Sequence, residues 1–253
     1  MMKLSKRLKQ VAEQVIHADV TADVGCDHGF TSIYLVRTGR TKRAIAMDIG
    51  REPLLRAKEH VVSYQMQEKI ELRRSDGLER LEKGEADALL ISGIGGRLMC
   101  RILKEGEEKV TGMKQLILSP QSDIPMVRRL LHEMGFCIER ERMVCDQKKY
   151  YVIIRAVPGD EKYEAEEEYL YGRYLIGKKD EVFIEFLKRE NRKTAEVISR
   201  MEESRLSAEG ELCLKKQKKT REQILRILHK MGIENIPEEV TDDGKKGKGY
   251  SGE

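Results

Sequence analysis

A short acidic and glycine-rich stretch contains the residues best suited to chemistry in this chain. Residues 23–29 spell DVGCDHG, directly after an apolar run and before a helical pattern. Glycines at a strand-to-helix turn let the backbone approach a bound dinucleotide. Here Asp27 occupies the place of the middle glycine, and its carboxylate would repel a diphosphate at the helix amino terminus. The stretch therefore favours a phosphate-free cation, and S-adenosylmethionine, with its sulfonium and ammonium groups, fits that description.

Further acids and glycines follow where such a ligand would need them. Asp48 lies 25 residues after Asp23, at the end of the next apolar run, where a carboxylate can accept hydrogen bonds from both ribose hydroxyls. Asp76, before Gly77, ends the third run, where it can accept from an adenine amine. Residues 92–96, SGIGG, let backbone pass close to a methyl donor and its target. Each feature alone is ordinary turn chemistry, so their joint placement carries the argument.

A parallel sheet would bring these residues together. Apolar runs alternating with helical patterns predict strands over residues 20–24, 44–48, 70–73, 87–92 and 115–119, then an antiparallel hairpin over 136–144 and 150–156. Helices are predicted over residues 4–15, 52–67 and 124–135, and from Thr31 onward. This order is typical of an α/β fold with a doubly wound, seven-stranded Rossmann-like sheet, in which ligands bind beyond the carboxyl ends of the strands.

A second region follows residues 158–160, Pro-Gly-Asp, where strand patterns cease. Helices are predicted over residues 163–175, 181–205 and 212–231, the last two forming an antiparallel helical hairpin or coiled coil. We therefore expect an α/β domain at residues 1–158, an all-α, coiled-coil-like domain at 159–240 and a disordered tail at 241–253.

Composition restricts the setting in which the protein works. Hydrophobic residues make up 40% and charged residues 36%, and no apolar stretch approaches the roughly 18 residues of a membrane span. The amino terminus lacks the apolar run of a secretory signal, which predicts a cytoplasmic protein without a membrane partner. Five cysteines without a CxxC pair predict neither a disulfide framework nor a metal site. Residues 1–158 hold 28 Lys and Arg against 22 Asp and Glu, a bias compatible with a nucleic-acid substrate.

Five motifs in order carry a family resemblance. They are DVGCDHG at 23–29, MDI at 47–49, SDGL at 75–78, SGIGG at 92–96 and LSPQ at 118–121. Over about residues 4–157 the chain resembles the bacterial tRNA (adenine-22-N1)-methyltransferase family. The resemblance implies a class I methyltransferase domain followed by a helical coiled-coil domain. It also implies methyl transfer from S-adenosylmethionine to N1 of a D-loop adenosine in tRNA, giving 1-methyladenosine. Cys26, Phe30, and Ser92 and Ile94 of SGIGG depart from the family pattern and concern pocket details.

The expected site residues fall into three groups. We expect the cofactor to be bound by Asp23, Gly25, Cys26, Asp27, His28, Gly29, Asp48, Ile49, Asp76, Gly77 and Gly93. The transfer site is expected to be lined by Gly93, Ile94 and Gly95, with no catalytic side chain identified. RNA is expected to be held by clustered cations, namely Lys3, Lys6, Arg7, Arg128 and Arg129. His28 is equally compatible with a structural role in the turn.

The implied reaction needs alignment more than proton transfer. N1 of adenine carries no proton, so its lone pair can attack the sulfonium methyl without a base, and alignment of the reacting atoms is worth about 7–11 kcal/mol at best. Residues 92–96 lack the Asn/Asp-Pro-Pro-aromatic motif typical of enzymes that methylate exocyclic amines. We expect a monomer, without metal, that acts on tRNA.

Two other functions remain open from the sequence. One is a class I methyltransferase acting on another RNA or on a small molecule. The other is a non-catalytic RNA-binding adapter, against which the acids at 23, 48 and 76 argue. The cations of the C-terminal helices fit a solvated face as well as a second grip on tRNA.

Overall fold

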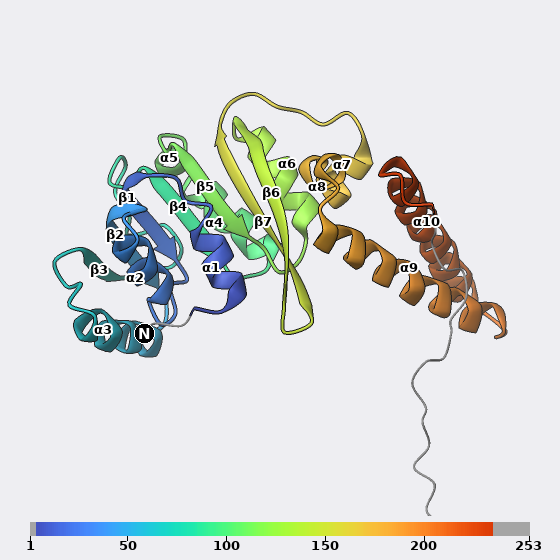
Figure 1. Ribbon diagram of the computed structural model, residues 1–253, viewed down its shortest axis with the longest axis horizontal. Helices are drawn as coiled ribbons and strands as arrows, with labels where there is room; N and C mark the ends of the chain where they lie inside the picture. The colour runs from blue at the N-terminus through green and yellow to red at the C-terminus, as the bar shows by residue number, and fades with distance from the viewer. Residues whose placement is uncertain (1–3, 235–253) are drawn as a thin grey trace, which may run out of the picture. The chain divides into compact units, whose positions relative to one another are not determined.

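The computed structural model describes residues 4–234, and it confirms the predicted α/β sheet (Figure 1). Seven strands form one sheet in the order β3-β2-β1-β4-β5-β7-β6. Neighbouring strands are parallel from β3 to β5, whereas β7 is antiparallel to both β5 and β6. The strands are β1 Ala18–Val24, β2 Thr41–Asp48, β3 Ile70–Arg74, β4 Ala88–Ser92, β5 Gln115–Ser119, β6 Phe136–Asp146 and β7 Lys149–Pro158.

Burial explains why the central strands were predictable. Every residue of β5 is buried, as are the first four residues of β4, which is the pattern of parallel strands covered on both faces. The amino-terminal ends of β1 and β2 were harder to predict. Strands β1 and β2 begin two or three residues before their predicted starts, in polar segments where Lys42 Nζ lies 2.6 Å from Asp19 Oδ1. Such a pair between neighbouring strands extends the ladder without an apolar signal.

The helices of the first part of the chain include two groups that pack on the sheet. They are α1 Lys6–Ala12, α2 Phe30–Arg37, α3 Arg51–Ser63, α4 Gly96–Glu105, α5 Glu107–Val110, α6 Ile124–Glu133, α7 Glu166–Tyr171 and α8 Arg173–Lys178 in the first part of the chain. Helix α2 contacts α1 and α3, whereas α4 contacts α5 and α6. Right-handed crossovers from β1 towards β3 and from β4 towards β5 run in opposite directions along the sheet, so these two groups cover opposite faces.

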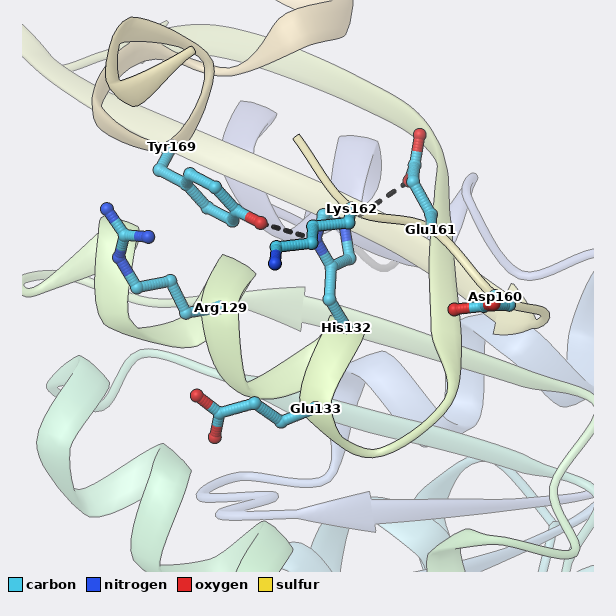
Figure 2. Close-up of a pocket in the computed structure, with 7 residues that line it drawn as sticks. All are labelled: Arg129, His132, Glu133, Asp160, Glu161, Lys162 and Tyr169. Carbon is cyan, nitrogen blue, oxygen red and sulfur yellow. Dashed lines mark hydrogen bonds and ion pairs between the residues drawn. The ribbon is translucent and has the colours of Figure 1, made fainter. Parts of the chain in front are cut away.

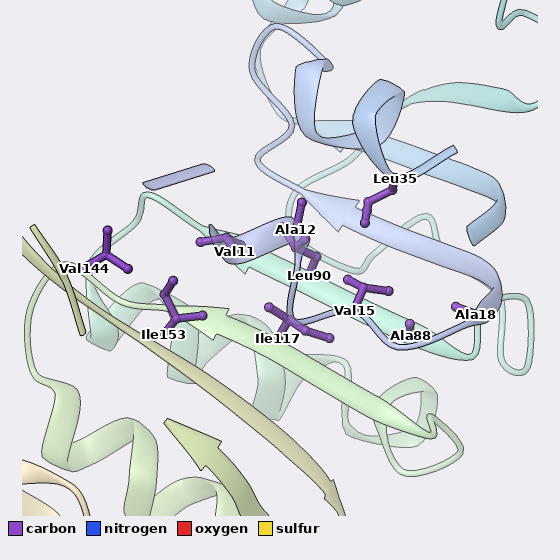
Figure 3. Packing of buried hydrophobic residues seen from close by; sticks show 10 residues of the cluster. All are labelled: Val11, Ala12, Val15, Ala18, Leu35, Ala88, Leu90, Ile117, Val144 and Ile153. Atoms are coloured by element: carbon purple, nitrogen blue, oxygen red, sulfur yellow. The ribbon is translucent and has the colours of Figure 1, made fainter. Parts of the chain in front are cut away.

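Helix α1 is held against the sheet by an apolar cluster (Figure 3). Val11 and Ala12 of α1 are fully buried with Leu35 of α2 and with residues of five strands. The complete cluster is Val11, Ala12, Val15, Ala18, Leu35, Ala88, Leu90, Ile117, Val144 and Ile153. Because burial of an aliphatic side chain contributes roughly 1.5–3 kcal/mol, this packing fixes the start of the chain beside β4 and the β6-β7 hairpin.

The predicted single helix over residues 163–175 is wrong in one respect. It is two short helices, α7 and α8, separated at Gly172, whose φ is +92°. A Cβ at Gly172 would collide with the Glu141 carboxylate and lie 2.8 Å from Arg128 Nη2. A glycine therefore allows the chain to turn tightly over a buried ion pair.

The chain divides into two compact units, Met1–Val182 and Phe183–Glu253. The first unit continues through α7 and α8, so it is longer than the α/β domain that we expected to end at residue 158. The domain boundary itself stays a prediction. The expected disordered tail at 241–253 lies outside the described residues.

Two long helices, α9 Glu181–Glu202 and α10 Ala208–Lys230, confirm the predicted C-terminal helical region. The second unit contains α10 and all but the first two residues of α9. Residues 203–206 separate them, and the Ser207 hydroxyl caps α10 by accepting from the Gly210 N–H. Lys218 Nζ lies 2.5 Å from Glu202 Oε1, which joins α10 to the end of α9. Among residues 4–234, no helix is both long and apolar enough to cross a bilayer.

Candidate functional site

A pocket of about 400 Å³ lies where the strand order reverses, between β1 and β4. In an open α/β sheet this point, beyond the carboxyl ends of the strands, is where ligands bind. Its lining comes from α1, the turn after β1 and the ends of β2, β4 and β5, namely Arg7, Leu8, Asp23, Gly25, Cys26, Asp27, His28, Phe30, Thr31, Asp48, Ser92, Gly93, Ile94 and Gln121. The fold thus gathers seven of the eleven expected cofactor residues around one cavity.

The turn after β1 is held in place by backbone hydrogen bonds. The N–H groups of Gly25 and Cys26 both donate to the Met47 carbonyl, at 2.9 and 3.0 Å. Gly25 and Gly29 have φ values of +74° and +70°, a conformation that glycine adopts without strain. Asp27 also has a positive φ, +48°, which aspartate tolerates better than most residues. This backbone path brings the turn against the end of β2.

Asp23 is a buried carboxylate near the end of β1. Its side chain is 2% exposed, and the Ser32 hydroxyl donates to Oδ2 at 2.6 Å. Burial raises the pKa of Asp23 to about 6, and the Ser32 hydrogen bond only partly offsets that effect. A cation in the pocket would stabilise the ionised form, so this position suits an ammonium or sulfonium group.

Asp48 ends β2 with its carboxylate held by two backbone donors. The Gly50 N–H donates to Oδ1 at 2.8 Å, and the Asp27 N–H donates to Oδ2 at 3.2 Å. Each carboxylate oxygen keeps a second lone pair, and Asp48 lines the pocket. Asp48 can therefore accept two further hydrogen bonds from a diol without giving up its orientation.

Aromatic rings surround the same turn. Phe30 stacks on His60 with ring centroids 4.2 Å apart, and His28 lies 5.8 Å from His60. A ring nitrogen of His60, Nδ1, is hydrogen-bonded to the His28 carbonyl at 2.9 Å. Burial, with Asp23 nearby, raises the pKa of the Cys26 thiol far above its ordinary value, so Cys26 is a protonated packing residue.

Some of the expected site residues do not line the pocket. Asp76 Oδ1 lies 3.4 Å from Arg101 Nη2, and Ile49 is 60% exposed. Gly29 and Gly95 are the N-cap residues of α2 and α4, and Gly77 packs against Ile102. The cofactor roles of Gly29, Ile49, Asp76 and Gly77, and the transfer-site role of Gly95, stay predictions.

One predicted RNA contact is wrong. Arg128 is 1% exposed, its Nε donates to Glu141 Oε1 at 2.7 Å and its Nη1 donates to the Tyr169 carbonyl at 2.7 Å. A phosphate could reach this guanidinium only if the Glu141 charge were left unpaired in the interior, which is strongly destabilising. The pattern of adjacent arginines could not show that the first one faces inward.

The other candidate RNA contacts fall into different environments. Lys6 is exposed, and Arg129 is accessible although it pairs with Glu166 and stacks on Tyr169 at 4.0 Å. Arg7 lines the pocket beside Gly93. Lys3 lies outside the described residues. The RNA roles of Lys3, Lys6 and Arg129 stay predictions.

A second pocket, of about 390 Å³, lies beside α6 and α7 (Figure 2). It is lined by Arg129, His132, Glu133, Asp160, Glu161, Lys162 and Tyr169. His132 Nε2 lies 3.3 Å from Glu161 Oε2, and His132 Nδ1 lies 3.1 Å from the Tyr169 hydroxyl. The two pockets have nearly equal volumes, so size does not distinguish them. The first contains Asp23, Asp27 and Asp48 at the ends of neighbouring strands. In the second, His132 pairs with Glu161, and Arg129 pairs with Glu166 outside the lining.

Sequence reasoning missed several residues of the first pocket. Leu8, Phe30, Thr31, Ser92 and Gln121 all line it. The N–H of Gln121 donates to the Ile94 carbonyl at 2.9 Å, which ties the end of β5 to the predicted transfer site. Gln121 stands two residues after a predicted strand, at the end of the LSPQ motif, and this position was the available signal for it. Leu8 looked like one more apolar residue of an amphipathic helix.

Comparisons with known proteins agree with this geometry. A family model described as a methyltransferase domain matches residues 4–154. The tRNA (adenine(22)-N(1))-methyltransferase of Bacillus subtilis is 36% identical over 188 residues, which are 72% of this chain and 79% of that protein.

Solved structures match over more of the chain. The crystal structure of the B. subtilis M1A22 tRNA methyltransferase has a TM-score of 0.80 at 30% identity, covering 90% of this chain and all of that one. Streptococcus pneumoniae Sp1610 in complex with S-adenosyl-L-methionine has a TM-score of 0.79 at 30% identity, with 90% of this chain and 100% of that chain covered. The chain therefore belongs to the methyltransferase-domain family and, within it, to the family of the B. subtilis tRNA (adenine(22)-N(1))-methyltransferase.

Proposed function

We propose that the protein transfers a methyl group from S-adenosylmethionine to N1 of adenine 22 in tRNA, giving 1-methyladenosine. The observation that carries the proposal is the pocket between β1 and β4, which gathers Asp23, Asp48 and Gly93 at neighbouring strand ends. The B. subtilis relative carries the name of this activity. The related S. pneumoniae structure holds S-adenosylmethionine.

The pocket residues fit this methyl donor. Asp23, Asp27 and Asp48 place three carboxylates around the cavity, as a ligand with ammonium and sulfonium groups requires. Arg7 is the only Lys or Arg among the described lining residues, so a diphosphate would meet little compensating charge. The donor set therefore supports S-adenosylmethionine over a nicotinamide or flavin dinucleotide.

Positioning is the main contribution of the protein to catalysis. When bound, S-adenosylmethionine supplies an electrophilic methyl group that the N1 lone pair can attack directly. Asp48 would hold the ribose, Asp23 the ammonium, and Gly93 leaves room for two ligands to approach each other. Alignment of this kind is worth about 7–11 kcal/mol at its best.

The target adenine has to leave its stack before it can react. N1 lies on the Watson–Crick edge, so an adenine of folded tRNA must be unpaired or extruded at a cost of a few kcal/mol. Lys3, Lys6 and Arg129 are the candidates that would hold the surrounding backbone. The helical pair α9 and α10 is a further candidate for a grip on tRNA.

Methylation of defined transcripts tests the proposal. Purified protein is incubated with methyl-labelled S-adenosylmethionine and a tRNA transcript carrying adenine 22, and with a matched transcript carrying guanine there. We expect 1-methyladenosine from the first transcript alone. Label in other RNA or in small molecules, with neither transcript modified, would indicate a different class I methyltransferase. Absence of S-adenosylmethionine binding in calorimetry would instead indicate a non-catalytic adapter.

The working state of the enzyme is also part of the proposal. We propose a cytoplasmic monomer that needs no metal ion. Light scattering during gel filtration should give the mass of one chain, and methylation should persist in a chelator.

A further inference from the structure

Arg7 stands apart from the other charged residues of the pocket. It is the one guanidinium among the described lining residues, which also include three carboxylates. A Cβ built on Gly93 would lie 3.7 Å from its Nη1 and 3.9 Å from its Nη2, so the guanidinium reaches the end of β4. Arg7 was expected to hold RNA, but its side chain lies where the methyl donor is proposed to bind.

The position of Arg7 is fixed from two sides. Its backbone N–H donates to Asp146 Oδ2 at 3.0 Å, which ties the first turn of α1 to the β6-β7 hairpin. Its Cζ lies 5.0 Å from the centroid of the Tyr151 ring, within the range of a cation–π contact. Val11 and Ala12 then anchor α1 in the apolar core. These contacts place the guanidinium before any ligand arrives.

One guanidinium nitrogen has no partner. Nη1 of Arg7 is buried and makes no hydrogen bond with any of the described residues. Leaving a buried donor of a charged group without an acceptor is destabilising, so such an atom points to an acceptor that the described residues do not supply. A small anion in the pocket would supply this acceptor and would also neutralise the guanidinium.

We infer that Arg7 binds the carboxylate of the methionyl part of S-adenosylmethionine, an inference that rests on the proposed function. S-adenosylmethionine ends in an ammonium and a carboxylate on the same carbon, so its site needs a cation close to an anion. Arg7 beside Gly93, with Asp23 in the same pocket, provides that pair. A guanidinium can bind a carboxylate through two parallel hydrogen bonds, which also orients the ligand. Arg7 is therefore a residue that positions the methyl donor, S-adenosylmethionine.

A phosphate of tRNA is the competing anion. A phosphate at Nη1 would have to enter a pocket lined by Asp23, Asp27 and Asp48, where like charges repel it. The amino-acid end of S-adenosylmethionine is a zwitterion, so its ammonium can pair with those carboxylates. The charge pattern of the pocket therefore favours the amino-acid end of the methyl donor.

Calorimetry with S-adenosylmethionine and with decarboxylated S-adenosylmethionine tests the inference, because the two ligands differ only in the carboxylate. We expect the wild-type protein to bind the first at least tenfold more tightly. Arg7→Met should weaken binding of S-adenosylmethionine at least tenfold and leave binding of the decarboxylated ligand within about twofold. The affinity of Arg7→Lys for S-adenosylmethionine should lie between those of the wild-type protein and Arg7→Met, because an ammonium keeps the charge but loses the paired donors.

The controls separate this role from others. Lys9→Met removes an exposed charge from the same helix and should change neither affinity. The Nε–Hε resonance of Arg7 in the wild-type protein should shift with S-adenosylmethionine and not with the decarboxylated ligand, a readout that needs no variant. Equal losses for both ligands in Arg7→Met, or a rise in the KM for tRNA alone, would overturn the inference and leave the proposed function standing. A wild-type protein that binds neither ligand would overturn both.

Discussion

Arg7 and Arg128 come from similar local patterns of positive charge, and the fold takes both out of bulk solvent by different routes. Arg128 is 1% exposed and its charge meets Glu141 at 2.7 Å. Arg7 lines the pocket between β1 and β4, and its buried Nη1 has no acceptor among residues 4–234. Arg128 has its counter-charge within the protein, whereas we infer that the counter-charge of Arg7 is the carboxylate of the methyl donor.

The difference extends to the surroundings of each arginine. The charge of Arg128 is met within the fold, because its Nε donates to Glu141 Oε1 at 2.7 Å. On the same helix, His132 Nε2 lies 3.3 Å from Glu161 Oε2 in the pocket shown in Figure 2. In the pocket between β1 and β4, Asp23 is buried without a described cation, and burial raises its pKa to about 6. Buried charge that is paired internally stabilises one structure, whereas buried charge without a partner marks a ligand site.

The largest expected effect is loss of the internal pair. Arg128→Met should lower the free energy of unfolding by about 3–5 kcal/mol, because Glu141 is then left in the interior without its counter-charge. Chemical denaturation with two spectroscopic probes measures this loss. The double variant Arg128→Met with Glu141→Leu should recover much of it. A single variant as stable as the wild-type protein would contradict the view that this pair is structural.

Asp23→Asn should separate ligand binding from stability. It should weaken S-adenosylmethionine binding by more than tenfold, since the ammonium loses its carboxylate. The pKa of Asp23 is raised from its ordinary 3.8 to about 6, so the stability that its protonated form contributes is present below about pH 4 and lost as pH rises through 6. The amide does not titrate, so the variant should melt roughly 5 °C or more above the wild-type protein at pH 8.

A pH series supplies the control for Asp23. The difference in Tm should shrink towards pH 4, where the wild-type carboxyl is protonated. The affinity of the wild-type protein for S-adenosylmethionine should fall below pH 6, where Asp23 becomes protonated. The affinity of Asp23→Asn should fall less over the same range, because the amide does not titrate. Equal melting temperatures at pH 8 would show that the Asp23 carboxylate is not a source of instability.

Asp48→Ala should have a smaller effect. We expect about tenfold weaker cofactor binding in calorimetry, because the hydrogen bonds to two ribose hydroxyls are lost. Asp48→Asn, which keeps one acceptor, is the matched variant and should lie closer to the wild-type affinity. Unchanged affinity in Asp48→Ala would remove the ribose assignment.

Arg129→Ala should produce the smallest change. Its ion pair with Glu166 lies at the surface, so the free energy of unfolding should change by less than about 1 kcal/mol. A phosphate contact would appear as a KM for tRNA raised a few-fold, with kcat unchanged and a weaker dependence on salt. Identical salt dependence in both proteins would exclude Arg129 from RNA binding.

Much of the fold followed from local patterns. The buried runs of β4 and β5 predicted their strands nearly to the residue, because strands covered on both faces are continuously apolar. The break between α7 and α8 was not predictable. A glycine is needed at position 172 because a side chain there would collide with the Arg128–Glu141 pair, whose residues belong to two other elements. Local propensity contains no information on such a contact.

The sequence by itself determined the sheet, the glycine turn after β1 and the acids at the strand ends, because the period of apolar residues and the chemistry of Asp and Gly are local properties. Only the tertiary structure decided the roles of the arginines. Whether a charged side chain faces solvent, a buried carboxylate or a ligand pocket depends on other elements of the fold. Arg128 meets Glu141 of β6, and the backbone N–H of Arg7 is held by Asp146, which lies 139 positions away. That choice is made when the elements pack.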